Sequence, residues 1–175
     1  MSFKPHVMAL AGSLFLAGCQ ASMPPLQPVD KVDLERFMGD WYVIANIPTF
    51  IETDAYNALE SYRLDDDGTI ATTFTFRKGG FDGEKKRYEP RGFVRDDPSN
   101  AIWGMQFIWP IKADYRIIYL TEDYSVTIIA RNKRDYVWLM AREPHMQPDE
   151  YEEALRVIED AGYDMSALRR VPQQW

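Results

Sequence analysis

The sequence predicts an all-β domain of eight antiparallel strands in up-and-down order, closed as a β-barrel or stacked as a sandwich, with one C-terminal α-helix packed outside. Segments of strand composition recur at nearly even spacing, and short turns separate them. Helical periodicity is found only after Pro144. Strands joined by short turns cannot form parallel βαβ units, so an antiparallel arrangement follows.

Each predicted strand is rich in β-branched or aromatic residues and is bounded by turn residues. The clearest is Thr69 to Arg77 (TIATTFTFR), which follows the hairpin signal Asp65-Asp66-Asp67-Gly68. The predicted strands cover residues 41–47, 56–64, 69–77, 85–95, 101–109, 115–121, 125–131 and 136–142. A barrel of eight strands is just wide enough to be filled by side chains or to hold one small ligand.

The predicted helix begins at Pro148, a residue suited to the first helical position, and ends before Gly162. Its apolar residues recur at helical spacing and are Tyr151, Ala154, Leu155, Ile158 and Ala161. We expect this face to pack on the outside of the barrel. The alternative is a helix that lies on a membrane surface, but its polar face is acidic and anionic lipid would repel it.

The first 18 residues have the pattern of a signal peptide. Lys4 precedes an apolar run over residues 7–17, which is far too short to span a bilayer. The run ends in Leu16-Ala17-Gly18-Cys19, which resembles the bacterial lipobox. That resemblance implies cleavage before Cys19, a diacylglycerol on its sulfur and an acyl group on its new amine. The alternative is an ordinary secretory signal with a chance cysteine.

Residues 19–31 are predicted to form a lipid-anchored tether, and residues 32–175 the folded domain. The stretch from Ala21 to Pro28 (ASMPPLQP) is Pro-rich, and we expect it to be too stiff and polar to join a core. Gln20 follows the cysteine, and in enteric-type sorting a residue other than Asp there favours the outer membrane. The expected location is therefore the outer membrane, by lipid anchor, with the barrel facing the periplasm.

Composition argues against several classes of function. The net charge of −7 does not suit nucleic acid, which requires a basic surface. The single cysteine allows no intramolecular disulfide, and the two histidines are His6, in the signal peptide, and His145. With Cys19 expected to carry lipid, no Cys–His pair remains for nucleophilic catalysis and no Ser–His pair is convincing. One available histidine does not favour a zinc site. We therefore expect no catalytic residues, no metal and no cofactor.

Three motifs carry a resemblance to a known family. Residues 33–42 (DLERFMGDWY) resemble the Gly-x-Trp opening motif of lipocalins, residues 132–136 (NKRDY) the second motif, and residues 137–142 (VWLMAR) the third. Together they make the chain similar, from Val32 onward, to bacterial lipocalins, in the group that includes apolipoprotein D and temperature-induced lipocalin. The resemblance implies a closed barrel.

The resemblance also assigns structural roles to five fold markers, Gly39, Trp41, Asp135, Tyr136 and Arg142. It implies that Arg142 lies across the Trp41 ring and closes one end of the barrel, a contact worth about 2 kcal/mol. Many lipocalins pin the C-terminal segment with a disulfide, which this chain lacks. Members of this group can form homodimers, and no residue here decides between monomer and homodimer.

Alternation along the strands selects one inward face. The residues expected to line a ligand cavity are Glu60, Tyr62, Thr72, Phe74, Phe76, Trp103, Met105, Phe107, Trp109, Tyr136, Trp138 and Met140. A β-bulge would reverse this alternation locally. Glu60 is unusual, because burying a carboxylate among aromatic side chains is unfavourable unless it is paired with a cation or hydrated. If it faces inward, it disfavours a fatty-acid carboxylate and favours a cationic head group. The alternative is a Glu near water, or an error of strand register.

The family resemblance implies reversible binding of a lipophilic ligand such as a fatty acid or lysophospholipid, with a storage or transport role in envelope maintenance or stress. The expected partners are this ligand and, through the anchor, a membrane. One alternative is sequestration of a tetrapyrrole or a hydrophobic toxin. Another is a structural envelope lipoprotein whose aromatic side chains simply fill the barrel.

Overall fold

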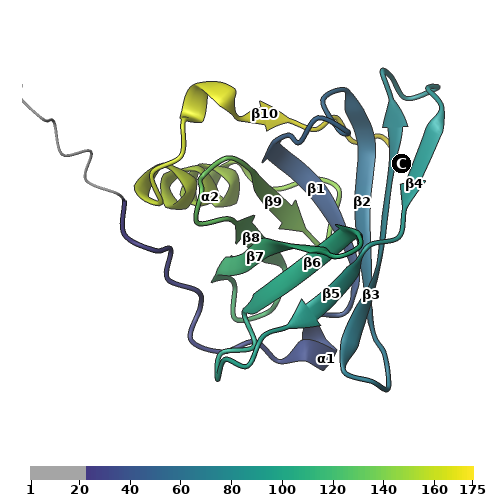
Figure 1. Cartoon of the computed structure of the whole chain (residues 1–175). Helices are drawn as coiled ribbons and strands as arrows, with labels where there is room; N and C mark the ends of the chain where they lie inside the picture. The colour runs from purple at the N-terminus through teal and green to yellow at the C-terminus, as the bar shows by residue number, and fades with distance from the viewer. Residues whose placement is uncertain (1–22) are drawn as a thin grey trace, which may run out of the picture.

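The computed structural model describes residues 23–175, so the predicted signal peptide and Cys19 lie outside the described residues. A continuous antiparallel sheet curls into a barrel (Figure 1). Its strands are β1 (Gly39–Ile47), β2 (Ala55–Leu64), β3 (Thr69–Lys78), β4 (Lys85–Tyr88), β5 (Arg91–Val94), β6 (Ile102–Ile108), β7 (Ile111–Leu120), β8 (Val126–Ala130) and β9 (Val137–Ala141). Because β1 pairs with both β2 and β9, the sheet closes, and the barrel rather than the sandwich is confirmed.

One predicted strand, residues 85–95, is divided into β4 and β5. The break contains Pro90, which has no N–H to donate to the neighbouring strand. The Pro90 carbonyl still accepts a hydrogen bond from the backbone N–H of Thr72 at 3.1 Å. Both pieces pair with β3, so they occupy one strand position and the barrel has eight.

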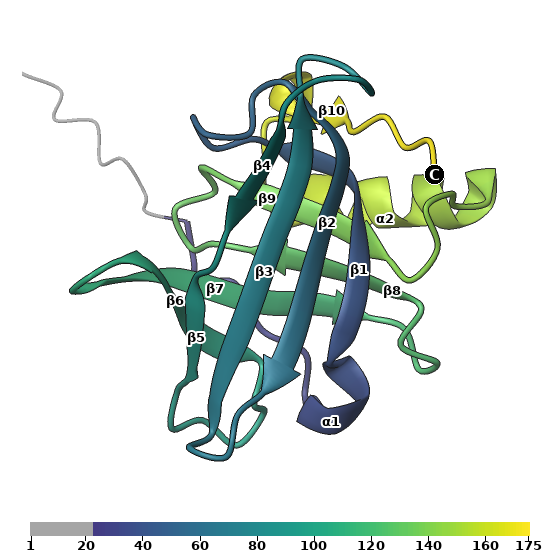
Figure 2. The same cartoon turned by 90° about the vertical axis from the view of Figure 1, so that its right-hand side faces the viewer.

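The up-and-down order places alternate turns at opposite ends of the barrel. The β1–β2 loop and the β3–β4, β6–β7 and β8–β9 turns lie at one end, which we call the open end. The β2–β3, β5–β6 and β7–β8 turns lie at the other, the closed end, beside the short helix α1 (Leu34–Phe37). Figure 2 shows α1 at the bottom of the barrel and the β6–β7 hairpin extending past its neighbours.

Arg142 closes the end beside α1. Its guanidinium donates to the carbonyl oxygens of Arg36, Phe37, Met38 and Asp40 over 2.8–3.1 Å. The same group lies 3.9 Å from the centroid of the Trp41 ring. The Arg142 side chain thus ties α1 to the first and last strands.

The helix α2 (Pro148–Asp160) packs on the outside of the barrel. It begins with a capping box between Gln147 and Glu150. Tyr151, Ala154 and Ile158 are buried in a second hydrophobic core that this helix forms with the barrel wall. The membrane-surface alternative for this helix is wrong, because the barrel covers its apolar face. Within residues 23–175, no helix combines the length and apolarity needed to cross a bilayer.

The segment before the barrel is more firmly held than its composition suggests. Leu26 is buried in the core beside α2, and its backbone N–H donates to Asn132 Oδ1 at 2.8 Å. The expectation that residues 21–28 stay out of the core is therefore wrong at Leu26. A polar Pro-rich composition does not reveal that its one leucine packs into the core beside α2.

The C-terminal segment is held without a disulfide. A short strand, β10 (Arg169–Arg170), pairs with β1. Beyond it, Gln173 Nε2 donates to the carbonyl oxygens of Val43 and Ala58 at 2.7 and 3.1 Å. These hydrogen bonds fasten the tail across the first two strands.

Candidate functional site

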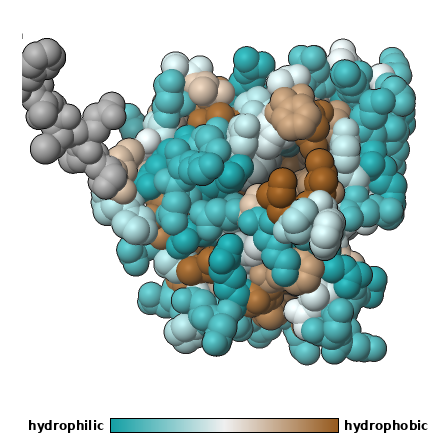
Figure 3. Space-filling view, viewed as in Figure 1, coloured by the Kyte–Doolittle hydropathy of each residue, from teal (hydrophilic) through white to brown (hydrophobic). Residues whose placement is uncertain are grey.

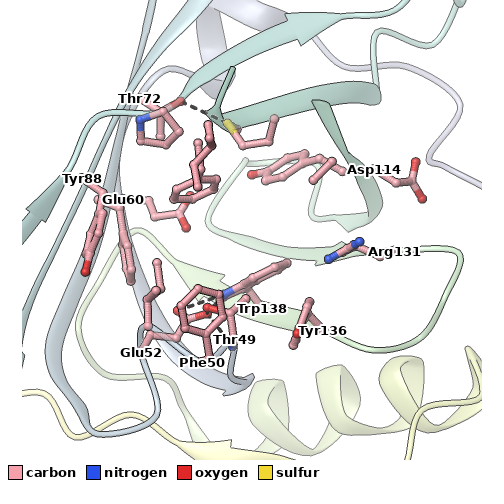
Figure 4. A pocket seen from close by; sticks show the side chains of 18 residues that line it. Thr49, Phe50, Glu52, Glu60, Thr72, Tyr88, Asp114, Arg131, Tyr136 and Trp138 are labelled. Carbon is pink, nitrogen blue, oxygen red and sulfur yellow. Dashed lines mark hydrogen bonds between the residues drawn. The ribbon is translucent and has the colours of Figure 1, made fainter. Parts of the chain in front are cut away.

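A cavity of about 310 Å³ lies inside the barrel toward its open end (Figure 4). Its wall is mostly apolar, with a few polar groups from facing strands. The lining residues are Thr49, Phe50, Ile51, Glu52, Glu60, Thr72, Phe74, Tyr88, Pro90, Met105, Phe107, Ile108, Ala113, Asp114, Tyr115, Arg131, Tyr136 and Trp138. A mostly apolar pocket of this volume suits a small hydrophobic ligand.

The structure brings together seven of the residues predicted from strand alternation. Those that line the cavity are Glu60, Thr72, Phe74, Met105, Phe107, Tyr136 and Trp138. Four others face inward but are packed in the barrel core, outside the cavity lining: Tyr62, Phe76, Trp103 and Met140. The alternation identified the inward face without indicating how deep the cavity extends.

Aromatic packing sets the floor of the cavity. Trp103 stacks on Tyr115 with 5.1 Å between ring centroids and 7° between ring planes. Its other neighbours include Phe37 and Tyr62, at 5.5 and 5.9 Å. These rings fill the lower half of the barrel, which leaves free space only toward the open end.

Trp109 does not lie where the alternation predicted. Its side chain is 82% exposed at the β6–β7 tip and does not line the cavity, whereas Ile108 does. The pairing of β6 with β7 shifts register between Met105 and Ile108. The strand ends at Ile108, so Trp109 lies in the β6–β7 turn, where the alternation of side chains no longer applies, and the prediction for Trp109 is wrong.

Glu60 faces the cavity from β2 and is only 8% exposed. The hydroxyl of Tyr62 donates a hydrogen bond to Glu60 Oε2. The Tyr115 hydroxyl lies 2.6 Å from that of Tyr62 and supplies the proton between them, because Tyr62 has already donated its own. Burial raises the pKa of Glu60 from its ordinary value of 4.5 to about 7. The cavity wall therefore holds a carboxyl group whose pKa lies near neutral pH.

A second buried carboxylate was missed by the sequence analysis. Glu52, in the β1–β2 loop, is 3% exposed and lines the cavity. It accepts hydrogen bonds from the backbone N–H and hydroxyl of Thr49 at 2.9 Å, and from Trp138 Nε1 at 3.2 Å. Burial raises its pKa, and its charge raises that of Glu60. A charged residue in a loop gives no periodic signal of burial.

The cation in the cavity wall already has a carboxylate beside it. Arg131 Nε lies 3.4 Å from Asp135 Oδ1, and its guanidinium lies 5.1 Å from the Tyr136 ring centroid. Asp114 accepts from Arg116 Nε at 3.1 Å and from the backbone N–H of Asn132 at 2.9 Å. Among residues 23–175, no three His, Cys, Asp or Glu side chains are grouped to hold a metal ion.

Comparison with known proteins agrees with this architecture. The profile of the family described as "Lipocalin-like domain" matches residues 32–173. The chain is 25% identical to the outer membrane lipoprotein Blc of Escherichia coli K12, over 99% of this chain and 98% of that protein. It is 29% identical to temperature-induced lipocalin-1 of Arabidopsis thaliana, over 85% of this chain and 83% of that protein.

Solved structures show the same fold. Insecticyanin from the tobacco hornworm Manduca sexta superposes with a TM-score of 0.67 at 17% identity, over 85% of this chain and 84% of that one. Apocrustacyanin C2 superposes with a TM-score of 0.65 at 10% identity, over 81% and 80% of the two chains.

Proposed function

This chain belongs to the lipocalin family, whose members bind small hydrophobic ligands, and we propose that its cavity reversibly binds the tail of a single-chain lipid. The observation that carries the proposal is the open, mostly apolar cavity of about 310 Å³ above a filled aromatic floor. Each methylene buried there contributes about 0.8 kcal/mol. Part of this gain is offset by ordering the chain, so a micromolar affinity is expected. The cavity also argues against a barrel that is simply filled by its own side chains.

The polar groups of the cavity indicate which head group is preferred. Glu52 and Glu60 are both buried in the wall, and neither is hydrogen-bonded to a Lys or Arg of residues 23–175. A fatty-acid carboxylate beside them adds a like charge in a poorly solvated site. A cationic amine, as in some lysophospholipids, gains an opposite charge instead. The preferred ligand is therefore a single-chain lipid with an amine-bearing head group.

The proposed location is the outer membrane, with Cys19 as the lipid attachment site and the barrel in the periplasm. The relatives named outer membrane lipoprotein Blc support this, since they match 93–99% of this chain. Two or more acyl chains hold a protein on a membrane nearly permanently. Lipid storage or transport within the envelope is the role that follows, and it requires no catalytic group.

Native mass spectrometry of the full chain extracted from its own membrane tests the ligand class. We expect a co-purifying mass that corresponds to a single-chain lipid. Extraction with no bound lipid, together with failure of an added lysophospholipid to bind, contradicts the proposal.

Head-group preference is tested with the Glu60→Gln variant. Lysophosphatidylethanolamine and a fatty acid of the same chain length are compared as ligands at pH 8. We expect the variant to reduce the preference for the amine-bearing lipid, whereas Glu89→Gln on the exposed surface leaves it unchanged. An unaltered preference in Glu60→Gln removes the head-group argument.

A further inference from the structure

The open end of the barrel carries an exposed apolar rim, formed by two segments that lie far apart in the sequence. We define the rim as Phe50, Phe107, Ile108, Trp109 and Ile111, whose side chains are 85%, 50%, 70%, 82% and 66% exposed. Figure 3 shows hydrophobic residues gathered on the face that carries β6 and the β1–β2 loop. Large apolar side chains that cluster in water usually mark a surface that contacts a partner or a membrane.

The rim is continuous with the cavity. Phe50, Phe107 and Ile108 are exposed on their outer side and also line the cavity wall. A partner that covers the rim therefore covers the entrance. A lipid bilayer placed there lets an acyl chain enter the barrel without crossing water.

The described chain begins at this same end. Arg134, in the β8–β9 turn, donates from Nη2 to the carbonyl oxygen of Pro24 at 2.8 Å. The Met23 side chain lies against Gly162, where an added Cβ would come within 2.1 Å of Met23 Cε. Only three residues lie between Cys19 and Met23 in the sequence. The first described residues therefore lie at the open end.

Charge differs between the two ends. Exposed lysines lie at the open end: Lys78 and Lys85 at the β3–β4 turn, and Lys133 at the β8–β9 turn. Three exposed acids share that end, and they are Asp54, Asp82 and Glu84. The closed-end turns expose mainly acids instead: Asp66, Asp67, Asp96, Glu122 and Asp123. An anionic lipid surface therefore attracts the open end more than the closed end.

We propose that the rim docks on an anionic lipid surface, with Trp109 inserted at the interface and the mouth of the barrel against the bilayer. Trp suits this position because its ring is apolar and its N–H can reach the polar head groups. The lysines at the open end meet lipid phosphates. Docking depends on the exposed rim and not on an occupied cavity, so it stands or fails separately from ligand binding.

The experiment uses the full chain and phospholipid vesicles whose acyl chains carry bromine, which quenches nearby Trp fluorescence. Wild type, Trp109→Phe and Trp175→Phe are compared, since Trp109 and Trp175 are both exposed but only Trp109 belongs to the rim. We expect brominated vesicles to quench wild type and Trp175→Phe alike. Quenching of Trp109→Phe is expected to fall several-fold, because the inserted reporter is gone.

A second variant alters the rim and keeps its reporter. Changing both Ile108 and Ile111 to Asp places charges at the interface, and we expect about tenfold less Trp109 quenching. Raising the salt concentration, or replacing anionic with zwitterionic lipid, is expected to lower the quenching of wild type. Circular dichroism checks that the double variant remains folded.

Three outcomes overturn the docking proposal. Quenching equal in wild type and Trp109→Phe shows that the rim does not insert. Quenching that disappears only in Trp138→Phe reports a brominated chain inside the cavity, which supports ligand binding but not docking. In the third outcome, vesicles cause no quenching, wild type has the mass of a dimer in solution, and the double rim variant has the mass of a monomer. That result shows that the rim joins two copies of this chain.

Discussion

The hydroxyl of Tyr62 donates a hydrogen bond to the carboxylate of Glu60 in the wall of the barrel cavity. Tyr115 completes the chain by donating to Tyr62 at 2.6 Å. The hydrogen bond from the Tyr62 hydroxyl stabilises the charged form of Glu60 and lowers its pKa. Burial raises the pKa by more than this, so that it reaches about 7. We therefore expect this carboxyl group to make both stability and ligand preference depend on pH.

Stability of the ligand-free protein is expected to fall as pH rises from about 4.5 to about 7. The folded state holds the Glu60 proton more tightly than the unfolded state, so ionisation favours unfolding in this window. The shift corresponds to about 3 kcal/mol. Urea unfolding across pH 4–8 measures how the unfolding free energy changes with pH. Glu60→Gln should lose most of this pH dependence, and the remainder comes from Glu52, whose pKa is also raised. An unchanged pH dependence in the variant contradicts the assignment; Glu89→Gln is the surface control.

Replacing Arg142 with Lys is expected to cost about 2–4 kcal/mol of unfolding free energy. An ammonium cannot donate to four carbonyl oxygens and cover the Trp41 ring at the same time. Urea unfolding measures the loss. The exposed Arg87→Lys serves as control and should change stability by less than about 0.5 kcal/mol. Equal stability of the two variants would refute the role of Arg142 in closing the barrel.

Gly39→Ala is expected to destabilise the protein by about 1–3 kcal/mol. Gly39 has a φ of +95°, and an added Cβ would lie 3.3 Å from Arg142 Nη1. Gly80→Ala is a matched control, because an added Cβ there meets nothing within 4 Å. Thermal unfolding of both variants tests the difference, and a similar melting temperature for the pair would count against it.

Thr72→Phe is expected to weaken lipid binding at least about tenfold by filling the cavity with an aromatic ring. Thr72 lines the cavity, whereas the adjacent Thr73 lies on the opposite face of β3. Thr73→Phe should therefore retain the wild-type affinity. Titration with a lysophospholipid, followed by Trp fluorescence, compares the two variants. Equal affinities would place the ligand elsewhere.

Much of the site could be predicted because β-strands alternate. Residues two positions apart on a strand share one face, and this spacing placed two pairs of residues inside the barrel. The pairs are Thr72 with Phe74 on β3 and Tyr136 with Trp138 near β9, and all four line the cavity. Tyr115 was missed, although the alternation along β7 could have shown its inward orientation. Glu52 could not have been found this way, because its burial depends on Thr49 and Trp138.

The sequence by itself determined the barrel, the helix on its outside and the inward face of most strands. Strand composition, turn residues and three local motifs act over short stretches of chain, so they can be read without coordinates. Only the tertiary structure decided where the cavity ends, because the floor forms where Phe37, Trp103 and Tyr115 meet from separate segments. It also decided that Trp109 is exposed beside the mouth, because β6 ends at Ile108 and Trp109 lies in the β6–β7 turn.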